Sequence, residues 1–132
     1  MRESTVERNL SALLVEDSPI LVERLREMLG NVEGVELTDV VDTEIAALRA
    51  IWNSAVDVIL LDLRLREGDG FGVLRTIAGR MPRPIVVVIS NYSLPEYRRT
   101  AHALGAQHFL DKAHEMEGLP AILTEIKRQI WH

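Results

Sequence analysis

Short apolar runs alternate along this chain with segments in which apolar residues recur at helical spacing. Strands that are apolar throughout are typical of a parallel sheet covered by helices on both faces, so the alternation predicts repeated βα units. The run from Pro84 to Ile89 is so rich in β-branched residues that only a strand fits it. Five strands are expected, at residues 12–15, 35–41, 56–61, 84–89 and 108–110.

Helices are expected after each strand, and local signals mark where several begin and end. Ser18 and Pro19 supply an N-cap and a first-turn proline for the first helix, which Gly30 ends. Ser93 and Glu96 have the spacing of a capping box ahead of the fourth helix. The last helix has an apolar stripe formed by Leu119, Ile122, Leu123, Ile126 and Ile130.

Length and composition fit one domain. With 132 residues, 47% of them apolar, the chain has room for one core, expected at residues 10–132 after a polar lead-in at residues 1–9. Cysteine is absent and the first residues lack the apolar stretch of a secretory signal, so a cytoplasmic location is expected. No apolar run is long enough to cross a bilayer, and a net charge of -5 argues against binding nucleic acid or a membrane surface.

Polar side chains directly follow four of the expected strands: Glu16 and Asp17, then Asp62, Ser90 and Lys112. Because the carboxyl ends of parallel strands open onto one crevice, these carboxylates, the hydroxyl and the ammonium should meet there. Grouped carboxylates suit Mg²⁺, and an aspartate beside such an ion is a competent nucleophile toward phosphorus. Asp62 is the best candidate acceptor because it follows the most apolar strand. Ser90 and Lys112 are expected to contact phosphoryl oxygens.

Each of these residues also has a simpler explanation, and other phosphate chemistries fit less well. Asp62 alone would most often be a turn residue, and Glu16 and Asp17 could merely favour the start of a helix. A haloacid dehalogenase phosphatase needs a second aspartate where this chain has Arg64, and a flavin binder needs hydroxyls rather than acids after the first strand. The segment 68–72 lacks the lysine of a P-loop and predicts a turn.

Taken together, these motifs resemble the receiver domain of two-component response regulators. The resemblance implies a flavodoxin-like (βα)5 fold, a doubly wound parallel sheet with strand order 2-1-3-4-5. It also implies that a histidine kinase or a histidine phosphotransfer protein donates the phosphoryl group. The matching stretches span almost the whole chain and are residues 14–17, 58–65, 68–70, 88–90 and 105–112.

The same resemblance implies a role for each residue of the expected site. Asp62 is the phosphoacceptor, Lys112 the lysine that contacts the phosphoryl group, Ser90 the switch hydroxyl and Phe109 the switch aromatic residue. The Mg²⁺ ligands that it implies are Glu16, Asp17, Asp62 and the backbone carbonyl of Arg64.

Several positions depart from the family's usual residues. Ala113 replaces the proline that commonly follows the lysine, so the peptide before it can be cis or trans. Arg66 stands where proline is common, which should loosen its loop, and Asn91 should narrow access to the acceptor. Arg64 and Tyr92 occupy positions that govern water attack in this family, and we expect them to shield the acyl phosphate.

These observations predict a stand-alone receiver that is not an enzyme and acts by binding a downstream protein that the sequence does not identify. It is expected to be a monomer or a weak homodimer formed through the last helix. Tyr92, Tyr97 and Phe109 predict a docking patch, whereas Arg98 and Arg99 are expected to be a solvated helix face. The alternative is a receiver-like interaction module that works without phosphorylation.

Overall fold

The computed structural model describes residues 9–131, and within them five parallel strands form one sheet in the order β2-β1-β3-β4-β5. The strands are β1 (Leu10–Val15), β2 (Val35–Val41), β3 (Val58–Leu61), β4 (Ile85–Ser90) and β5 (His108–Asp111). The helices are α1 (Pro19–Gly30), α2 (Glu44–Asn53), α3 (Gly70–Ile77), α4 (Pro95–Ala103), a short 3-10 helix η1 (Met116–Gly118) and α5 (Leu119–Ile130). The predicted flavodoxin-like fold and strand order are therefore confirmed.

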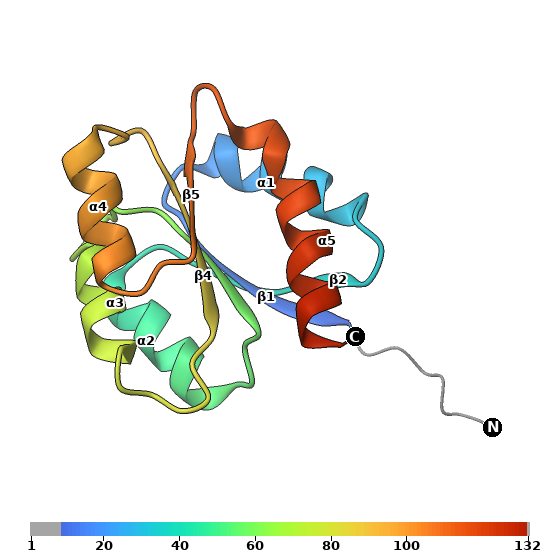
Figure 1. Ribbon diagram of the computed structural model, residues 1–132, viewed down its shortest axis with the longest axis horizontal. Helices are drawn as coiled ribbons and strands as arrows, with labels where there is room; N and C mark the ends of the chain where they lie inside the picture. The colour runs from blue at the N-terminus through green and yellow to red at the C-terminus, as the bar shows by residue number, and fades with distance from the viewer. Residues whose placement is uncertain (1–8, 132) are drawn as a thin grey trace.

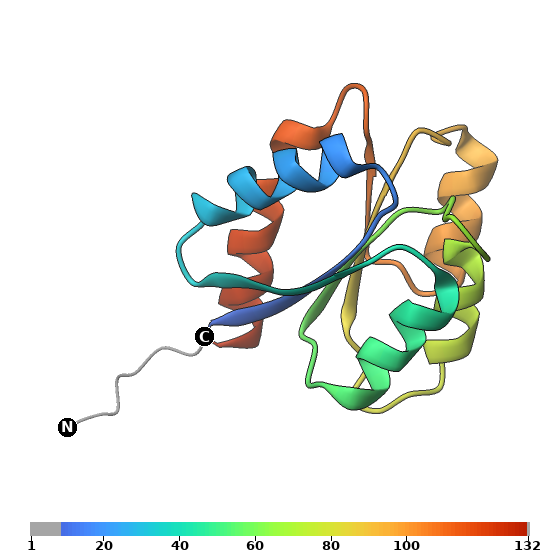
Figure 2. The same ribbon diagram turned by 180° about the vertical axis from the view of Figure 1, so that it is seen from behind.

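Two helical layers enclose the sheet, with α1 and α5 on one face and α2, α3 and α4 on the other (Figures 1 and 2). Alternate residues of each strand supply the two cores, because successive side chains point to opposite faces. In β3, Leu60 packs with Leu25 and Leu123 on the α1–α5 side, whereas Leu61 packs with Leu74 on the other. Both strand residues are fully buried, which explains why the central runs are apolar throughout.

The predicted start of the first helix is confirmed, and that of the fourth is wrong. Ser18 caps α1 by accepting a hydrogen bond from the backbone N–H of Leu21 at 3.3 Å, and Pro19 occupies the first turn. In α4 the N-cap position is Leu94, with no side-chain cap. The hydroxyl of Ser93 instead donates to the carboxylate of Asp111 at 2.6 Å, and hydrogen bonds to an ionised acceptor are stronger than those between neutral groups.

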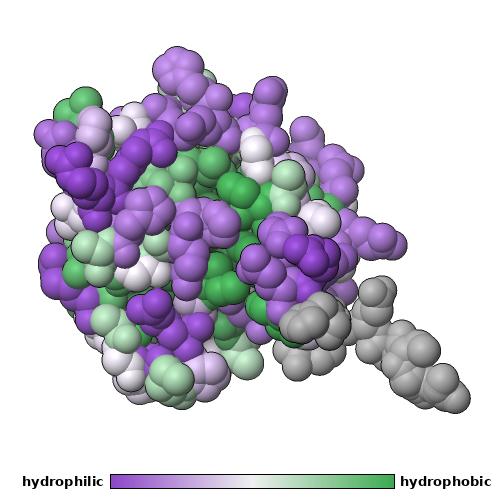
Figure 3. All heavy atoms as spheres, in the orientation of Figure 1, coloured by the Kyte–Doolittle hydropathy of each residue, from purple (hydrophilic) through white to green (hydrophobic). Residues whose placement is uncertain are grey.

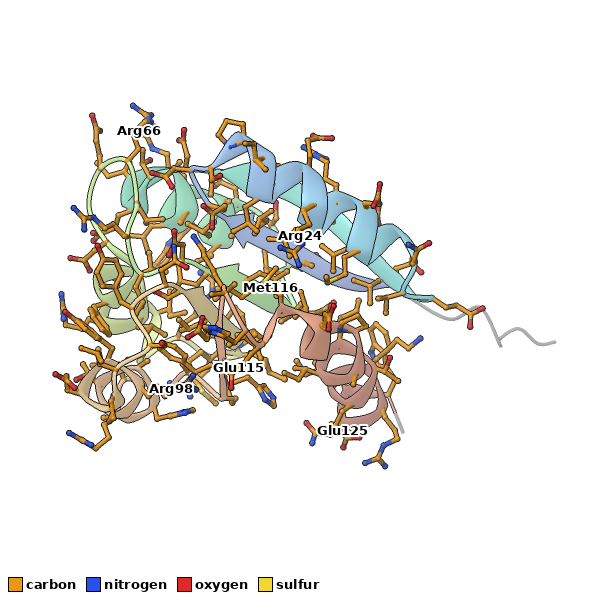
Figure 4. All side chains as sticks on the ribbon, turned by 90° about the horizontal axis from the view of Figure 1, so that it is seen from above. Arg24, Arg66, Arg98, Glu115, Met116 and Glu125 are labelled. Carbon is orange, nitrogen blue, oxygen red and sulfur yellow. The ribbon has the colours of Figure 1, made fainter. Side chains whose placement is uncertain are left out.

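The strand register brings the ends of β1, β3, β4 and β5 to one edge of the sheet. Val15 lies opposite Leu61, and Leu61 lies opposite Val88 in the adjacent strand. Ser90 is paired with Asp111 at the ends of β4 and β5. The residues that follow these positions therefore share one rim, which Figure 4 shows from above.

Residues 1–8, most of the predicted polar lead-in, lie outside the described residues, and Asn9 is exposed. None of the helices found between residues 9 and 131 combines the length and the apolar character needed to cross a membrane. Figure 3 shows apolar surface between α4 and α5, over the edge strand β5, among mostly hydrophilic side chains.

Candidate functional site

Three carboxylates meet at the rim of the sheet. Glu16 and Asp17 follow β1, Asp62 follows β3, and one oxygen from each lies within 4.8 Å of the others. The pairing of β1 with β3 holds them there, since the backbone N–H of Asp62 donates to the carbonyl of Val15 at 3.0 Å. Glu16 and Asp62 are buried, whereas Asp17 is exposed. They lie in a cleft lined by Glu16, Asp17, Ser18, Asp62, Arg64, Asn91, Tyr92 and Lys112.

Lys112 reaches this cleft from the end of β5. Its ammonium nitrogen lies 2.9 Å from an Asp62 carboxylate oxygen and 3.0 Å from a Glu16 oxygen. The backbone N–H of Lys112 donates to the carbonyl of Ser90, and the following peptide, to Ala113, is trans. A trans peptide therefore still delivers the ammonium to Asp62. The second contact, with Glu16, is one that the sequence did not reveal.

Burial raises the pKa of the Asp62 carboxyl above its usual value, although the hydrogen bond and charge of Lys112 oppose this. Burial, followed by the negative charge of Asp62, likewise raises the pKa of Glu16. Burial acts to lower the pKa of Lys112, but its hydrogen bonds and charge pairing with Asp62 and Glu16 outweigh this, and the pKa is raised. Burial and mutual repulsion therefore disfavour the ionised forms of the carboxyl groups in this site.

The donor set fits a divalent cation. Three carboxylates opposed by one ammonium leave a net charge of -2 when all are ionised (one positive minus three negative charges). All three donors of the cluster are oxygens, which are the ligands that Mg²⁺ prefers, and Asp17 is open to solvent. Glu16, Asp17 and Asp62 are therefore suited to hold Mg²⁺.

Arg64 and Tyr92 lie together beside the acceptor. The backbone N–H of Arg64 donates to an Asp62 oxygen at 3.3 Å. Its guanidinium donates to the Tyr92 hydroxyl and lies 5.5 Å from the centre of the Tyr92 ring. Both residues line the cleft, so the pair joins the β3–α3 loop to the β4–α4 loop at the edge of the site. The role of the Arg64 carbonyl as a metal ligand stays a prediction.

Ser90 is at the end of β4, and its expected contact with a phosphoryl oxygen stays a prediction. The side chain is fully buried, and its hydroxyl oxygen accepts a hydrogen bond from the backbone N–H of Tyr92 at 2.9 Å. Among residues 9–131 no hydrogen bond joins Ser90 to Asp62. The structure thus gathers Glu16, Asp17, Asp62 and Lys112, and leaves the Ser90 hydroxyl bonded within its own loop.

Arg98 is a structural link rather than part of a solvated face, so that prediction is wrong for this residue. Its guanidinium donates to the carbonyl of Ser93 at 3.1 Å and to Glu115 at 2.8 Å, and it lies 4.8 Å from the centre of the Phe109 ring. Figure 4 shows Arg98 and Glu115 next to each other. Phe109 is only 7% exposed beneath it. No sequence motif reveals this link, because its members lie on three separate segments.

Two further contacts shape the loop after Asp62. Arg66 pairs with Asp42 at 3.1 Å, so this residue ties its loop to the β2–α2 loop instead of loosening it. Gly70 packs against the backbone of the acceptor, where a Cβ would lie 2.5 Å from the Asp62 carbonyl oxygen. The predicted turn ends with Asp69, whose carboxylate caps α3 through the N–H of Gly72.

The fold and this acidic rim are typical of α/β domains with a phosphoacceptor site, and comparison with known proteins agrees. The model of the response regulator receiver domain matches residues 12–124. The chain therefore belongs to the response regulator receiver domain family of two-component signalling.

Individual relatives are similar over part or most of the chain. A protein-glutamate methylesterase/protein-glutamine glutaminase of Myxococcus xanthus is 37% identical over 66% of this chain and 25% of its own length. The transcriptional regulatory protein MalR of Bacillus subtilis is 26% identical over 91% of this chain and 51% of its own. This chain thus spans from about a quarter to about half of these relatives.

Solved structures show the same fold. The response regulatory domain of mrkE from Klebsiella pneumoniae superposes with a TM-score of 0.82 at 20% identity, over 90% of this chain and 96% of that one. The receiver domain of a Francisella response regulator superposes with a TM-score of 0.83 at 19% identity, over 92% of this chain and 99% of that one.

Proposed function

We propose that this chain is a single-domain response regulator in which Asp62 accepts a phosphoryl group from the phosphohistidine of a kinase or phosphotransfer protein. Its output is then binding to another protein. The observation that supports this most strongly is the position of the Lys112 ammonium, 2.9 Å from Asp62 and 3.0 Å from Glu16. A cation held between two buried carboxylates is placed where a transferred phosphoryl group would need one.

In the proposed transfer, an oxygen of Asp62 forms a bond to phosphorus while the phosphorus–nitrogen bond of the phosphohistidine breaks. The electron pair of that bond stays with the imidazole, which then takes a proton from solvent. Mg²⁺ bound by Glu16, Asp17, Asp62 and the carbonyl of Arg64 would neutralise the charge of the transferred group. Lys112 exchanges its contact with Asp62 for one with a phosphoryl oxygen.

The same step would operate the switch. The Ser90 hydroxyl oxygen accepts the N–H of Tyr92, so its O–H can still donate to a phosphoryl oxygen, and a shift of Ser90 toward that oxygen would draw Tyr92 with it. Tyr92 in turn holds Arg64, so movement of Ser90 is transmitted to the loop that follows Asp62. Phe109, next to Leu110 in β5 and covered by Arg98, is the proposed aromatic member of the switch.

Arg64 and Tyr92 are proposed to slow hydrolysis of the acyl phosphate, because their hydrogen bond occupies the edge of the cleft from which water would approach. The double variant Arg64→Ala, Tyr92→Ala should lose phosphate faster than the wild type. Slower loss from the variant would contradict this role.

The central proposal is tested by incubating the protein with Mg²⁺ and acetyl phosphate and then measuring its intact mass. A labile added phosphoryl group is expected in the wild type and in Glu36→Gln, an exposed control on β2, and not in Asp62→Asn. The competing function is an interaction module that works without phosphate, and it is suggested by Ala113 and Asn91, which depart from the family's usual residues beside the site. No added mass in the wild type would support that alternative.

A further inference from the structure

The outer face of α2 carries a stripe of exposed apolar side chains. Ile45 is 62% exposed and Trp52 is 60% exposed, with the half-buried Leu48 between them. These residues are three and four positions apart, so they lie on one face of the helix. They border a shallow hollow together with Arg49 and Asn53. We call Ile45, Leu48 and Trp52 the Trp52 stripe.

The core does not require this stripe. The opposite face of α2 supplies Ala47 and Ile51 to the core, and both are buried. Figure 2 shows α2 as the outermost helix of its layer, with α3 beside it on one side. Arg80 stacks on Trp52, with its guanidinium 4.8 Å from the ring centre. A large aromatic side chain is thus stacked and held in place at the surface.

Two arginines border the stripe, although the whole chain carries a net charge of -5. Arg49 lines the hollow, and the guanidinium of Arg80 lies over the Trp52 ring. On α2 itself, the carboxylate of Glu44 is turned away to accept the backbone N–H of Asp69 at 3.0 Å. Within residues 9–131, no ion pair uses Arg49 or Arg80.

We propose that the Trp52 stripe, with Arg49 and Arg80, is a docking surface for an acidic amphipathic helix of another protein. Apolar residues at helical spacing would cover the stripe, which runs about 10 Å along α2, or two turns of a partner helix. Flanking Glu or Asp side chains would pair with the two arginines. Tryptophan and arginine are the residue types that most often dominate binding energy in such interfaces.

A second copy of this chain is a poorer occupant of the same surface. Two copies joined face to face through the stripe would bring the arginines of one surface toward those of the other. No acidic side chain of α2 is available to compensate, because Glu44 is engaged with the α3 N-terminus. The surface also differs from the acidic cleft, so the proposal does not depend on phosphorylation of Asp62.

The test uses two synthetic helical peptides of about 14 residues with identical leucine positions at helical spacing. One carries Glu at the flanking positions and the other carries Lys. Amide chemical-shift changes in the labelled full chain are followed by NMR during titration. The Glu peptide is expected to bind at least tenfold more tightly, with shifts confined to α2 and residues 78–83.

Two variants and a matched control test whether the two arginines and Trp52 account for binding of the peptide. Arg49→Glu, Arg80→Glu should reverse the preference so that the Lys peptide binds better, and Trp52→Ser should weaken the Glu peptide at least tenfold. Arg24→Glu, Arg99→Glu makes the same charge change at exposed positions on α1 and α4 and should leave binding of the Glu peptide on α2 intact.

Several outcomes would overturn the proposal. These are binding of neither peptide at millimolar concentration, equal binding of both, or shifts centred on another face. Dimerisation of the free chain that Trp52→Ser abolishes would show instead that a second copy occupies the stripe. Circular dichroism of each variant confirms that its fold is retained.

Discussion

Replacing Asp17 with Asn should stabilise the folded chain when no divalent cation is present, since it removes one of three crowded carboxylates. One oxygen from each of Glu16, Asp17 and Asp62 lies within 4.8 Å of the other two. At this distance two unit charges repel by about 0.9 kcal/mol in bulk water and about 3.5 kcal/mol at an effective dielectric constant of 20. Because Asp17 is exposed, the lower figure applies to its two pairs and gives about 2 kcal/mol.

Two losses reduce this gain. Asp17 lies just before α1, where a negative charge is worth about 0.3–1 kcal/mol against the helix dipole. Its attraction to the Lys112 ammonium is also lost. The net expected stabilisation is therefore at most about 1 kcal/mol.

The assay is urea denaturation followed by circular dichroism, first with chelator and then with Mg²⁺. Binding of the cation to the folded state stabilises it by about 2.7 kcal/mol when the free ion is at 100 times its dissociation constant. Asp17→Asn should gain much less stability from Mg²⁺, so the wild type should be the more stable of the two proteins when Mg²⁺ is present. The control Glu36→Gln removes the same charge from the exposed side of β2 and should respond to Mg²⁺ as the wild type does. Lower stability of Asp17→Asn in chelator, or an unchanged Mg²⁺ response, would refute the electrostatic reasoning.

Three further substitutions test the core, the acceptor loop and the Arg98 link. Leu60→Ala leaves a cavity in the fully buried central strand and should lower the free energy of unfolding by about 2–5 kcal/mol, measured by urea titration. Gly70→Ala places a Cβ 2.5 Å from the Asp62 carbonyl oxygen, so it should lower the free energy of unfolding by about 1–3 kcal/mol. It should also slow phosphorylation by acetyl phosphate. An unchanged rate of phosphorylation would argue against this contact. The hydrogen bond from Arg98 lowers the pKa of Glu115, so their pairing stabilises the fold above the ordinary carboxyl pKa and is lost as the pH falls through the lowered value. Arg98→Ala should therefore be less stable than the wild type at pH 7, with a gap that narrows in acid; a gap that stays constant down to pH 3 would contradict the link.

Much of the fold was predictable because strand and helix signals are local. The run ending at Leu61 is apolar because both faces of its strand are covered, and that requirement is visible in the sequence. Ser18 and Pro19 marked the start of α1 for the same local reason. Ser93 shows where local signals fail: its spacing to Glu96 suggested a cap, but its hydroxyl bonds Asp111, eighteen residues away in the chain.

The candidate site likewise has a part that the sequence predicted and a part that only the structure shows. The positions of Glu16, Asp17, Asp62 and Lys112 after their strands determined that carboxylates and an ammonium would share a rim, because parallel strands end on one side of the sheet. Which atoms touch depended on packing and register. The contact of Lys112 with Glu16 is one that only the folded chain reveals.

The sequence by itself determined the order of elements, the buried strands and the chemical groups that gather at their carboxyl ends, because each is encoded in residue type and short-range spacing. Only the tertiary structure decided the partners of long side chains. In the folded chain Arg98 packs on Phe109 and Arg64 donates a hydrogen bond to Tyr92. Trp52 stacks on Arg80 at the surface. The physical reason is that such partners come from segments distant in the chain, and their meeting depends on the relative position of whole helices and loops.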